Sequence, residues 1–217
     1  MKGINIMYKR NFIINIISSI LISIIFIVLS IKITLSYKTL YYNDIYNLFI
    51  YKDVDLTIDQ IKNIYDYLIY YLNSRKNIDF ILPYLPSSKE GVIHFKEVKS
   101  IILNIYNIFN VSLIISLPLI YTNLKNKNLE FLKYSSILLL SFPLLLIPFS
   151  LNFHKSFDIF HRMFFANDYW LFDPIKDPII TLLPEQFFFH CAFLITSLIT
   201  LSGMINIYLY IKLKSKL

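Results

Sequence analysis

The stretch NFIINIISSILISIIFIVLSI, residues 11–31, contains no charged side chain. Three further uncharged runs follow it, at residues 100–124, 134–153 and 186–211. Each run is long enough for the roughly 20 mostly apolar residues that a membrane-spanning helix needs. Because a single segment in lipid can satisfy its own backbone hydrogen bonds only as a helix, the four runs predict four transmembrane helices.

The composition agrees with a membrane protein. The chain has 217 residues, of which 56% are hydrophobic and 16% are charged, and it has only three glycines. Its mean hydropathy is +0.57. These values exclude a disordered chain, a collagen-like fibre and an ordinary soluble domain. The single cysteine, Cys191, has no second cysteine with which to form an internal disulfide.

We therefore expect an all-α membrane protein, a single integral membrane domain over residues 1–217. Its four helices are expected at about residues 11–35, 99–124, 134–153 and 186–211. A small extracytoplasmic segment, 37–98, joins the first two helices, and an aromatic interfacial segment, 154–185, joins the last two. A cleaved signal peptide is the alternative for the first helix, but its apolar core is long for one, so we favour an uncleaved anchor.

The net charge of +7 follows this topology. Basic residues gather at both termini and between the second and third helices: Lys2, Lys9, Arg10, Lys125, Lys127, Lys133, Lys212, Lys214 and Lys216. The positive-inside rule then places both termini in the cytoplasm and the segments 37–98 and 154–185 on the other side of the membrane. Because topology explains the excess of positive charge, we exclude nucleic-acid binding.

The segment 37–98 contains two local signals. Thr57 and Gln60 have the spacing of a capping box, in which each side chain bonds the other residue's backbone amide. Apolar residues at helical spacing follow and predict a helix that ends near residues 73–76: Ile58, Ile61, Tyr65, Leu68 and Leu72. The short apolar run 78–82, stopped by Pro83, is a candidate strand.

Histidines are the best candidates for chemistry. Two of them have a carboxylate one helical turn away, since Glu97 follows His94 by three residues and Asp158 precedes His161 by three. A carboxylate beside an imidazole fixes its tautomer and raises its basicity, as a general base requires. For His154 and His190 we favour an interfacial position without a chemical role.

Other catalytic signatures are absent from the sequence. It contains no G-x-S-x-G, C-x-x-C, H-E-x-x-H or phosphate-binding loop pattern. A zinc site made of His94, His154, His161 and an acid would match no standard ligand spacing. We therefore expect no metal and no cofactor.

Two segments resemble a known family of bacterial integral membrane proteins, the lipoprotein intramolecular transacylases. The first is HFKEVK, residues 94–99, where the family pattern is His, an apolar residue, any residue, an acid (usually Asp) and Val. The second is FDIFHRMFF, residues 157–165, which continues through NDYW, Asp173-Pro174 and Asp177 to LPEQFF at residues 183–188. The likeness spans essentially the whole chain and is least in residues 37–88.

The resemblance implies an acyl transfer within one lipid-modified protein. The sn-2 acyl chain of a diacylglyceryl-cysteine lipoprotein would move to the N-terminal α-amino group of that cysteine, giving the lyso-form. The partners would be the lipoprotein N-terminus and membrane lipid. The resemblance assigns catalysis to His94 and His161, one as base and the other as donor, in either order. Supporting or substrate-binding candidates are Glu97, Asp158, Arg162, Asp168, Trp170, Asp173 and Asp177.

Several alternatives remain open at this point. For Trp170 we favour packing or interfacial anchoring over contact with substrate. The chain as a whole is alternatively another outer-leaflet lipid acyltransferase or lipase. A non-catalytic membrane sensor or assembly factor is the third hypothesis.

Overall fold

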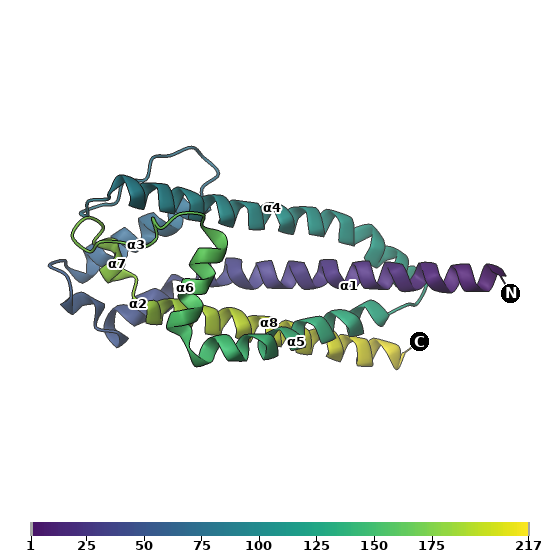
Figure 1. Ribbon diagram of the computed structural model, residues 1–217. Coiled ribbons are helices and arrows are strands. Elements are labelled where there is room, and N and C mark those ends of the chain that lie inside the picture. The colour runs from purple at the N-terminus through teal and green to yellow at the C-terminus, as the bar shows by residue number, and fades with distance from the viewer. Residues whose placement is uncertain (1, 217) are drawn as a thin grey trace. The chain divides into compact units, whose positions relative to one another are not determined.

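The computed structural model describes residues 2–216, with side chains from residue 11 onward. No strand occurs within residues 2–216, so this part of the chain is all-α, as the sequence predicts (Figure 1). In chain order the helices are α1 (Lys2–Ser36), α2 (Lys38–Asn47), the 3₁₀ turn η1 (Ile50–Lys52), α3 (Ile58–Asn73), α4 (Lys89–Lys125), α5 (Glu130–Leu151), α6 (Phe153–Phe164), α7 (Ile179–Leu182) and α8 (Glu185–Lys214).

Four of these helices, α1, α4, α5 and α8, are long and apolar enough to cross a membrane. Each of them begins before its uncharged run. The largest difference is in α4, which begins at Lys89 rather than near residue 99. A helix continues through charged residues as long as its backbone bonds continue, so the apolar run marks only the part that fits in lipid.

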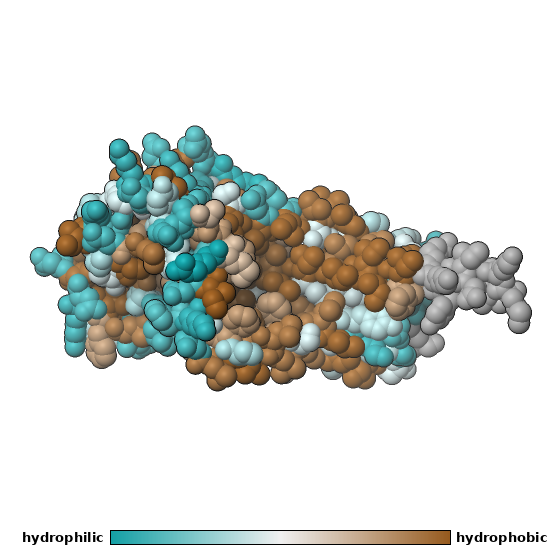
Figure 2. Space-filling model, viewed as in Figure 1, coloured by the Kyte–Doolittle hydropathy of each residue, from teal (hydrophilic) through white to brown (hydrophobic). Residues whose placement is uncertain are grey.

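The chain packs into two compact units. The first contains Met1–Lys32, Tyr106–Ile147 and Leu194–Leu217, and the second contains Ile33–Ile105 and Pro148–Phe193. Apolar side chains cover much of the visible surface of the first unit (Figure 2). Ile114, Leu117 and Leu144 are each at least 60% exposed. Such a surface suits contact with lipid tails.

Small polar side chains join the helices of the first unit. Asn123 donates from Nδ2 to Oγ of Ser18 over 3.0 Å, and both are buried. Asn206 donates in the same way to Ser135 over 3.1 Å. Serine and asparagine between transmembrane helices allow close approach and replace hydrogen bonds that lipid cannot provide.

The second unit is held together by an aromatic core. The ring of Tyr41 on α2 stacks on that of Tyr65 on α3, with 3.9 Å between centroids. Phe187 at the start of α8 meets Tyr41 edge-on at 5.1 Å. The Tyr41 hydroxyl donates to the carbonyl of Leu182 in α7 over 2.8 Å. Four helices of the unit therefore meet at one buried tyrosine.

The predicted strand at residues 78–82 is wrong, because no strand in the described part of the chain pairs with it. The hydroxyl of Tyr67 takes the place of a strand partner: it donates to the Asp79 carbonyl and accepts from the Ile81 amide. Phe80 and Leu82 are buried and Ile81 is 71% exposed. Buried and exposed side chains alternate here as in a strand, but the backbone hydrogen bonds to a neighbouring strand are not formed.

The predicted capping box of α3 is confirmed. The Gln60 amide donates to Oγ1 of Thr57, and the Thr57 amide donates to Oε1 of Gln60. The apolar face behind the cap is buried, with Ile61, Leu68 and Leu72 each less than 10% exposed.

Replacing the cap will loosen the first turn of α3. In Thr57→Ala we expect the loss of about 1 kcal/mol of local stability, which corresponds to about five-fold faster hydrogen exchange at the amides of residues 58–61. Thr57→Ser keeps the acceptor and is the control. Equal exchange in Thr57→Ala and the wild type would contradict this role.

Candidate active site

Two helices of the second unit carry the candidate histidines. His94 lies in the second turn of α4, and His161 lies near the end of α6, which runs across the direction of α4 (Figure 1). α6 begins where the Asn152 side chain accepts the Lys155 amide over 3.1 Å. It ends where Phe165 turns to an extended conformation. The backbone thus leaves α6 directly beside His161.

The structure brings the two candidate histidines together. The centroids of the His94 and His161 rings are 6.1 Å apart, and the ring planes differ by 31°. His94 is 5% exposed, whereas His161 is half-buried. Their neighbouring edges can therefore serve one small reacting group.

Aromatic rings enclose the pair. Phe165 lies 4.6 Å from the His94 ring and 5.7 Å from the His161 ring, between centroids. Phe172 meets His94 edge-on at 5.4 Å. Phe157 lies 4.2 Å from His161. This shell lowers the local dielectric, which strengthens any hydrogen bond made to a reacting atom inside it.

His161 has a defined tautomer. Its Nδ1 lies 2.8 Å from the carbonyl oxygen of Phe157, so Nδ1 carries the proton and donates it. Nε2 is then left with a lone pair. Burial lowers the pKa of His161, against the opposing effects of the Phe157 carbonyl and Asp158. The imidazole is therefore neutral near pH 7 and can accept a proton at Nε2.

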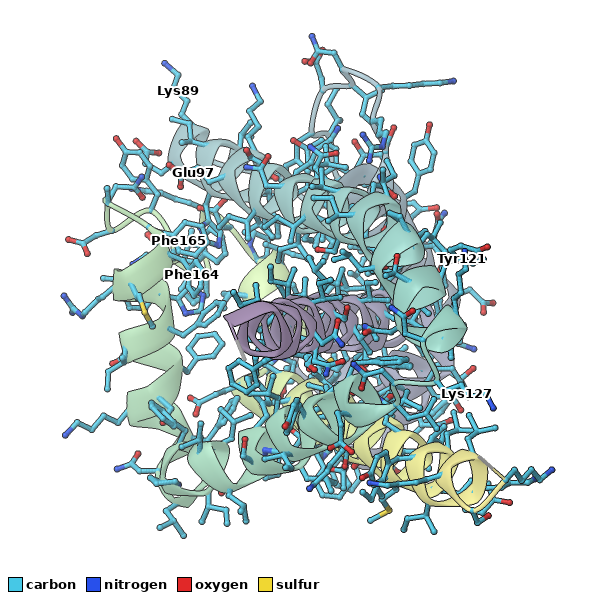
Figure 3. All side chains as sticks on the ribbon, turned by 90° about the vertical axis from the view of Figure 1, so that its right-hand side faces the viewer. Lys89, Glu97, Tyr121, Lys127, Phe164 and Phe165 are labelled. Carbon is cyan, nitrogen blue, oxygen red and sulfur yellow. The ribbon has the colours of Figure 1, made fainter. Side chains whose placement is uncertain are left out.

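Glu97 does not pair with His94 as the sequence suggested. Its Oε1 accepts from Nδ2 of Asn167 over 2.8 Å. Asn167 lies in the loop after α6, and its Oδ1 accepts the Tyr169 amide. Figure 3 shows Glu97 on α4 and Phe165 at the end of α6. Glu97 thus ties α4 to the loop that supplies the aromatic shell, and sequence reasoning did not select Asn167.

Three buried polar atoms near the pair have no protein partner among the described residues: His94 Nδ1, Glu97 Oε2 and Trp170 Nε1. An unsatisfied buried donor or acceptor costs about 1–3 kcal/mol. Such groups are rare in folded proteins, and several close together are typical of a site that bonds a ligand or ordered water.

Asp177 fixes the start of the helix that carries His94. It is buried, and its Oδ1 accepts the Ser88 amide over 2.8 Å. Ser88 in turn accepts the Gly91 amide at its hydroxyl over 2.9 Å. Gly91 packs so closely against Asp177 that a Cβ there would lie 2.9 Å from Cγ of the carboxylate. His94 follows Gly91 by one turn.

The other supporting candidates lie around the site or in its loops. Asp158 is half-buried on α6, and the Arg162 guanidinium lies over the Trp170 ring at 5.8 Å. Asp173 caps a turn by accepting the Ile175 amide over 3.0 Å. Asp168 is exposed, and its carbonyl accepts the Leu171 amide. Asp168 and Asp173 therefore shape the loop.

A cavity of about 340 Å³ adjoins the histidine shell. Three of its lining rings also contact a histidine: Phe157, Trp170 and Phe172. Asp158 and Glu185 supply polar groups to the same lining.

The other two histidines are each paired with a carboxylate. His154 Nδ1 lies 2.8 Å from Glu185, which raises the pKa of His154. His190 Nδ1 lies 2.8 Å from Oδ2 of Asp44, which is buried on α2. Sequence reasoning missed Asp44, because 146 positions separate it from His190 and no motif connects them.

No group of three or more histidine, cysteine, aspartate or glutamate side chains is placed to hold a metal ion within the described part of the chain. The hypothetical zinc site of His94, His154 and His161 thus has no support in the geometry.

The chain is similar to known membrane proteins. Residues 16–188 match the sequence family described as lipoprotein intramolecular transacylase Lit. A solved structure of the membrane-integral lipoprotein intramolecular transacylase Lit from Bacillus cereus is 39% identical, with a TM-score of 0.93 over 96% of this chain and 97% of that one.

Two further structures of the Bacillus cereus protein are each 37% identical and cover 99% of this chain. One has a histidine-to-arginine mutation, a TM-score of 0.91 and 96% of its own chain covered. The other has a histidine-to-alanine mutation, a TM-score of 0.90 and 98% covered. No curated protein sequence matches.

Because Gly91 contacts Asp177, we predict that Gly91→Ala changes stability in the direction opposite to that usual for Gly→Ala in a helix. Gly→Ala within a helix ordinarily stabilises by about 0.5–1 kcal/mol. Here we expect Gly91→Ala to destabilise by about 1–3 kcal/mol, because the new methyl overlaps the carboxylate. Thermal unfolding in detergent measures the change.

The double variant Gly91→Ala with Asp177→Ala tests the cause. The overlap disappears when the carboxylate is removed. The stability losses of the two single variants, Gly91→Ala and Asp177→Ala, should therefore sum to more than the stability loss of the double variant. Additive losses would show that the contact is not responsible.

The stack of His161 on Trp170 provides a pH readout. Trp170 is the only tryptophan in the sequence, and protonated imidazole quenches indole fluorescence. The folded pKa of His161 is lowered from 6.5, so we expect quenching only as the pH falls below 6.5. His161→Ala should abolish the transition, and a midpoint at or above 6.5 would refute the burial effect.

Proposed function

Because this chain belongs to the lipoprotein intramolecular transacylase family, we propose that it moves the sn-2 acyl chain of a diacylglyceryl-modified cysteine to the α-amino group of that cysteine. The product is a lipoprotein with an N-acylated cysteine and a lyso-glyceryl thioether. The protein is a membrane-integral acyltransferase. The observation that carries the finer proposal is the pairing of buried His94 with half-buried His161, with 6.1 Å between ring centroids and the His161 ring held in a fixed tautomer.

The reaction needs no nucleophile from the protein. The α-amino group of the substrate attacks its own ester, so the enzyme must only bring the two groups together and move one proton. An α-amino group has a pKa of about 7.7–8.0, so a base as weak as imidazole can deprotonate it. The absence of a nucleophile elbow from the sequence agrees with this chemistry.

We assign the base to His161. Its Nδ1–H is held by the Phe157 carbonyl, which leaves the Nε2 lone pair to accept the amine proton. The same nitrogen then returns the proton to the departing sn-2 oxygen. His94, buried and lacking a protein partner at Nδ1, donates a hydrogen bond to the oxyanion. The sequence leaves open which histidine is the base, and this assignment rests on the tautomer of His161.

We further propose that both termini lie in the cytoplasm and that the histidine pair acts at the outer leaflet of a bacterial cell membrane. The basic residues at both termini and around Lys125–Lys133 support this orientation through the positive-inside rule. Lipoproteins anchored by their acyl chains would then approach from the outer leaflet.

Removing either histidine of the pair should abolish the reaction. In cells that express His94→Ala or His161→Ala, we expect N-acylated lyso-form lipoprotein to fall at least about 100-fold, because each variant loses a proton-transfer or oxyanion-stabilising group. Mass spectrometry of lipoprotein N-terminal peptides measures the product.

His154→Ala is the matched control. It removes another imidazole from α6, but one that pairs with Glu185 rather than with the histidine pair. The control should keep its product. Unmodified α-amino groups in cells that express the wild type would refute the transacylase proposal, and changed glycerolipids would instead indicate a lipid acyltransferase or lipase.

A further inference from the structure

We propose that the indole N–H of Trp170 donates a hydrogen bond to the carbonyl oxygen of the scissile sn-2 ester and is a catalytic residue. The inference rests on the transacylation proposed above. It assigns to Trp170 a direct role in place of the packing role that the sequence favoured.

The first support is an unused donor. Trp170 is 6% exposed, and its Nε1 has no hydrogen-bond partner among the described side chains and backbone. Buried tryptophans usually satisfy this N–H, because leaving it unpaired costs about 1–3 kcal/mol. A substrate oxygen that accepts from Nε1 would recover this cost during the reaction.

The second support is the position of the ring. The indole stacks on His161 with 4.8 Å between centroids and 26° between planes. An indole N–H lies in its ring plane, so it points past the imidazole face rather than into it. The Trp170 N–H therefore lies beside the proposed base, His161, without donating a hydrogen bond to it.

The third support is a shortage of other donors. Nδ1–H of His161 already bonds the Phe157 carbonyl, and Nε2 must accept the amine proton. A neutral His94 offers a single N–H. Enzymes that form tetrahedral intermediates commonly present two donors to the oxyanion, and Trp170 is a buried ring beside the pair that has one available.

Arg162 and the cavity strengthen the assignment. The guanidinium lies over the indole at 5.8 Å, and a cation above the π face draws electron density from the ring, so the N–H becomes a better donor. Trp170 also lines the 340 Å³ cavity.

The step balances without a further reactant. The amine nitrogen forms a bond to the ester carbon, and its proton passes to Nε2 of His161. The carbonyl π electrons move onto oxygen, where His94 and Trp170 donate to the negative charge. The electron pair on the oxyanion then re-forms the carbonyl, the bond from carbon to the sn-2 oxygen breaks with its electrons going to that oxygen, and that oxygen takes the proton from His161. The new amide has no titratable amine.

The test removes the donor and keeps the ring. We replace Trp170 by benzothienylalanine, in which sulfur substitutes for the N–H while the bicyclic shape and the stack on His161 remain. With a synthetic diacylglyceryl-cysteine peptide in detergent, we expect kcat to fall about 10²–10³-fold, as for other oxyanion donors, with KM changed by less than about three-fold. Tyr169→Phe, which removes a hydroxyl from the next residue, should retain full kcat.

The outcomes separate this inference from the proposed function. Wild-type kcat in the benzothienylalanine protein would overturn the role of Trp170 and leave the transacylation intact. A rise in KM with unchanged kcat would also overturn it, because the bond would then form equally in the ground state. An inactive wild-type enzyme would overturn the proposed function itself.

A second measurement does not depend on a variant that folds. The single tryptophan gives a single indole ¹H–¹⁵N resonance in the wild-type protein. On binding a peptide whose sn-2 ester is replaced by a phosphonate, this proton should shift downfield as it acquires an anionic acceptor. An unchanged resonance in the saturated complex would refute the hydrogen bond.

Discussion

A backbone amide in hydrocarbon has no water to bond, and this constraint fixes the larger part of the molecule. It requires helices wherever the chain crosses lipid, and it explains why α1, α4, α5 and α8 are long and continuous. The two candidate histidines lie near helix ends, where the regular backbone hydrogen-bond ladder stops. His94 lies in the second turn of α4, and His161 lies in the last turn of α6.

Local and periodic features could be predicted from the sequence. The four apolar runs fixed the all-α class, and Thr57 with Gln60 fixed the start of α3, because each depends on residues close in the chain. The two histidines were selected by motif. Their proximity depends on the direction of α6, which no local pattern specifies.

Long-range pairings were beyond sequence reasoning. Glu97 was expected beside His94 because helical spacing allows it, yet its carboxylate bonds Asn167, which is 70 positions away. Asp44 and His190 meet across 146 positions. Likewise, the charged residues 89–98 concealed the true beginning of α4. There Ser88 accepts the Gly91 amide, and Asp177, which lies after α6 in the chain, accepts the Ser88 amide.

The fit of Gly91 against Asp177 also constrains how related sequences can diverge. No side chain fits at position 91 while a carboxylate fills the space beside it, and the carboxylate is needed to bond the Ser88 amide. Positions 91 and 177 are therefore expected to change together in evolution rather than singly. Homologues that keep the acid should keep the glycine, and a lineage that acquires a larger residue at 91 must find another acceptor for the first turn of this helix.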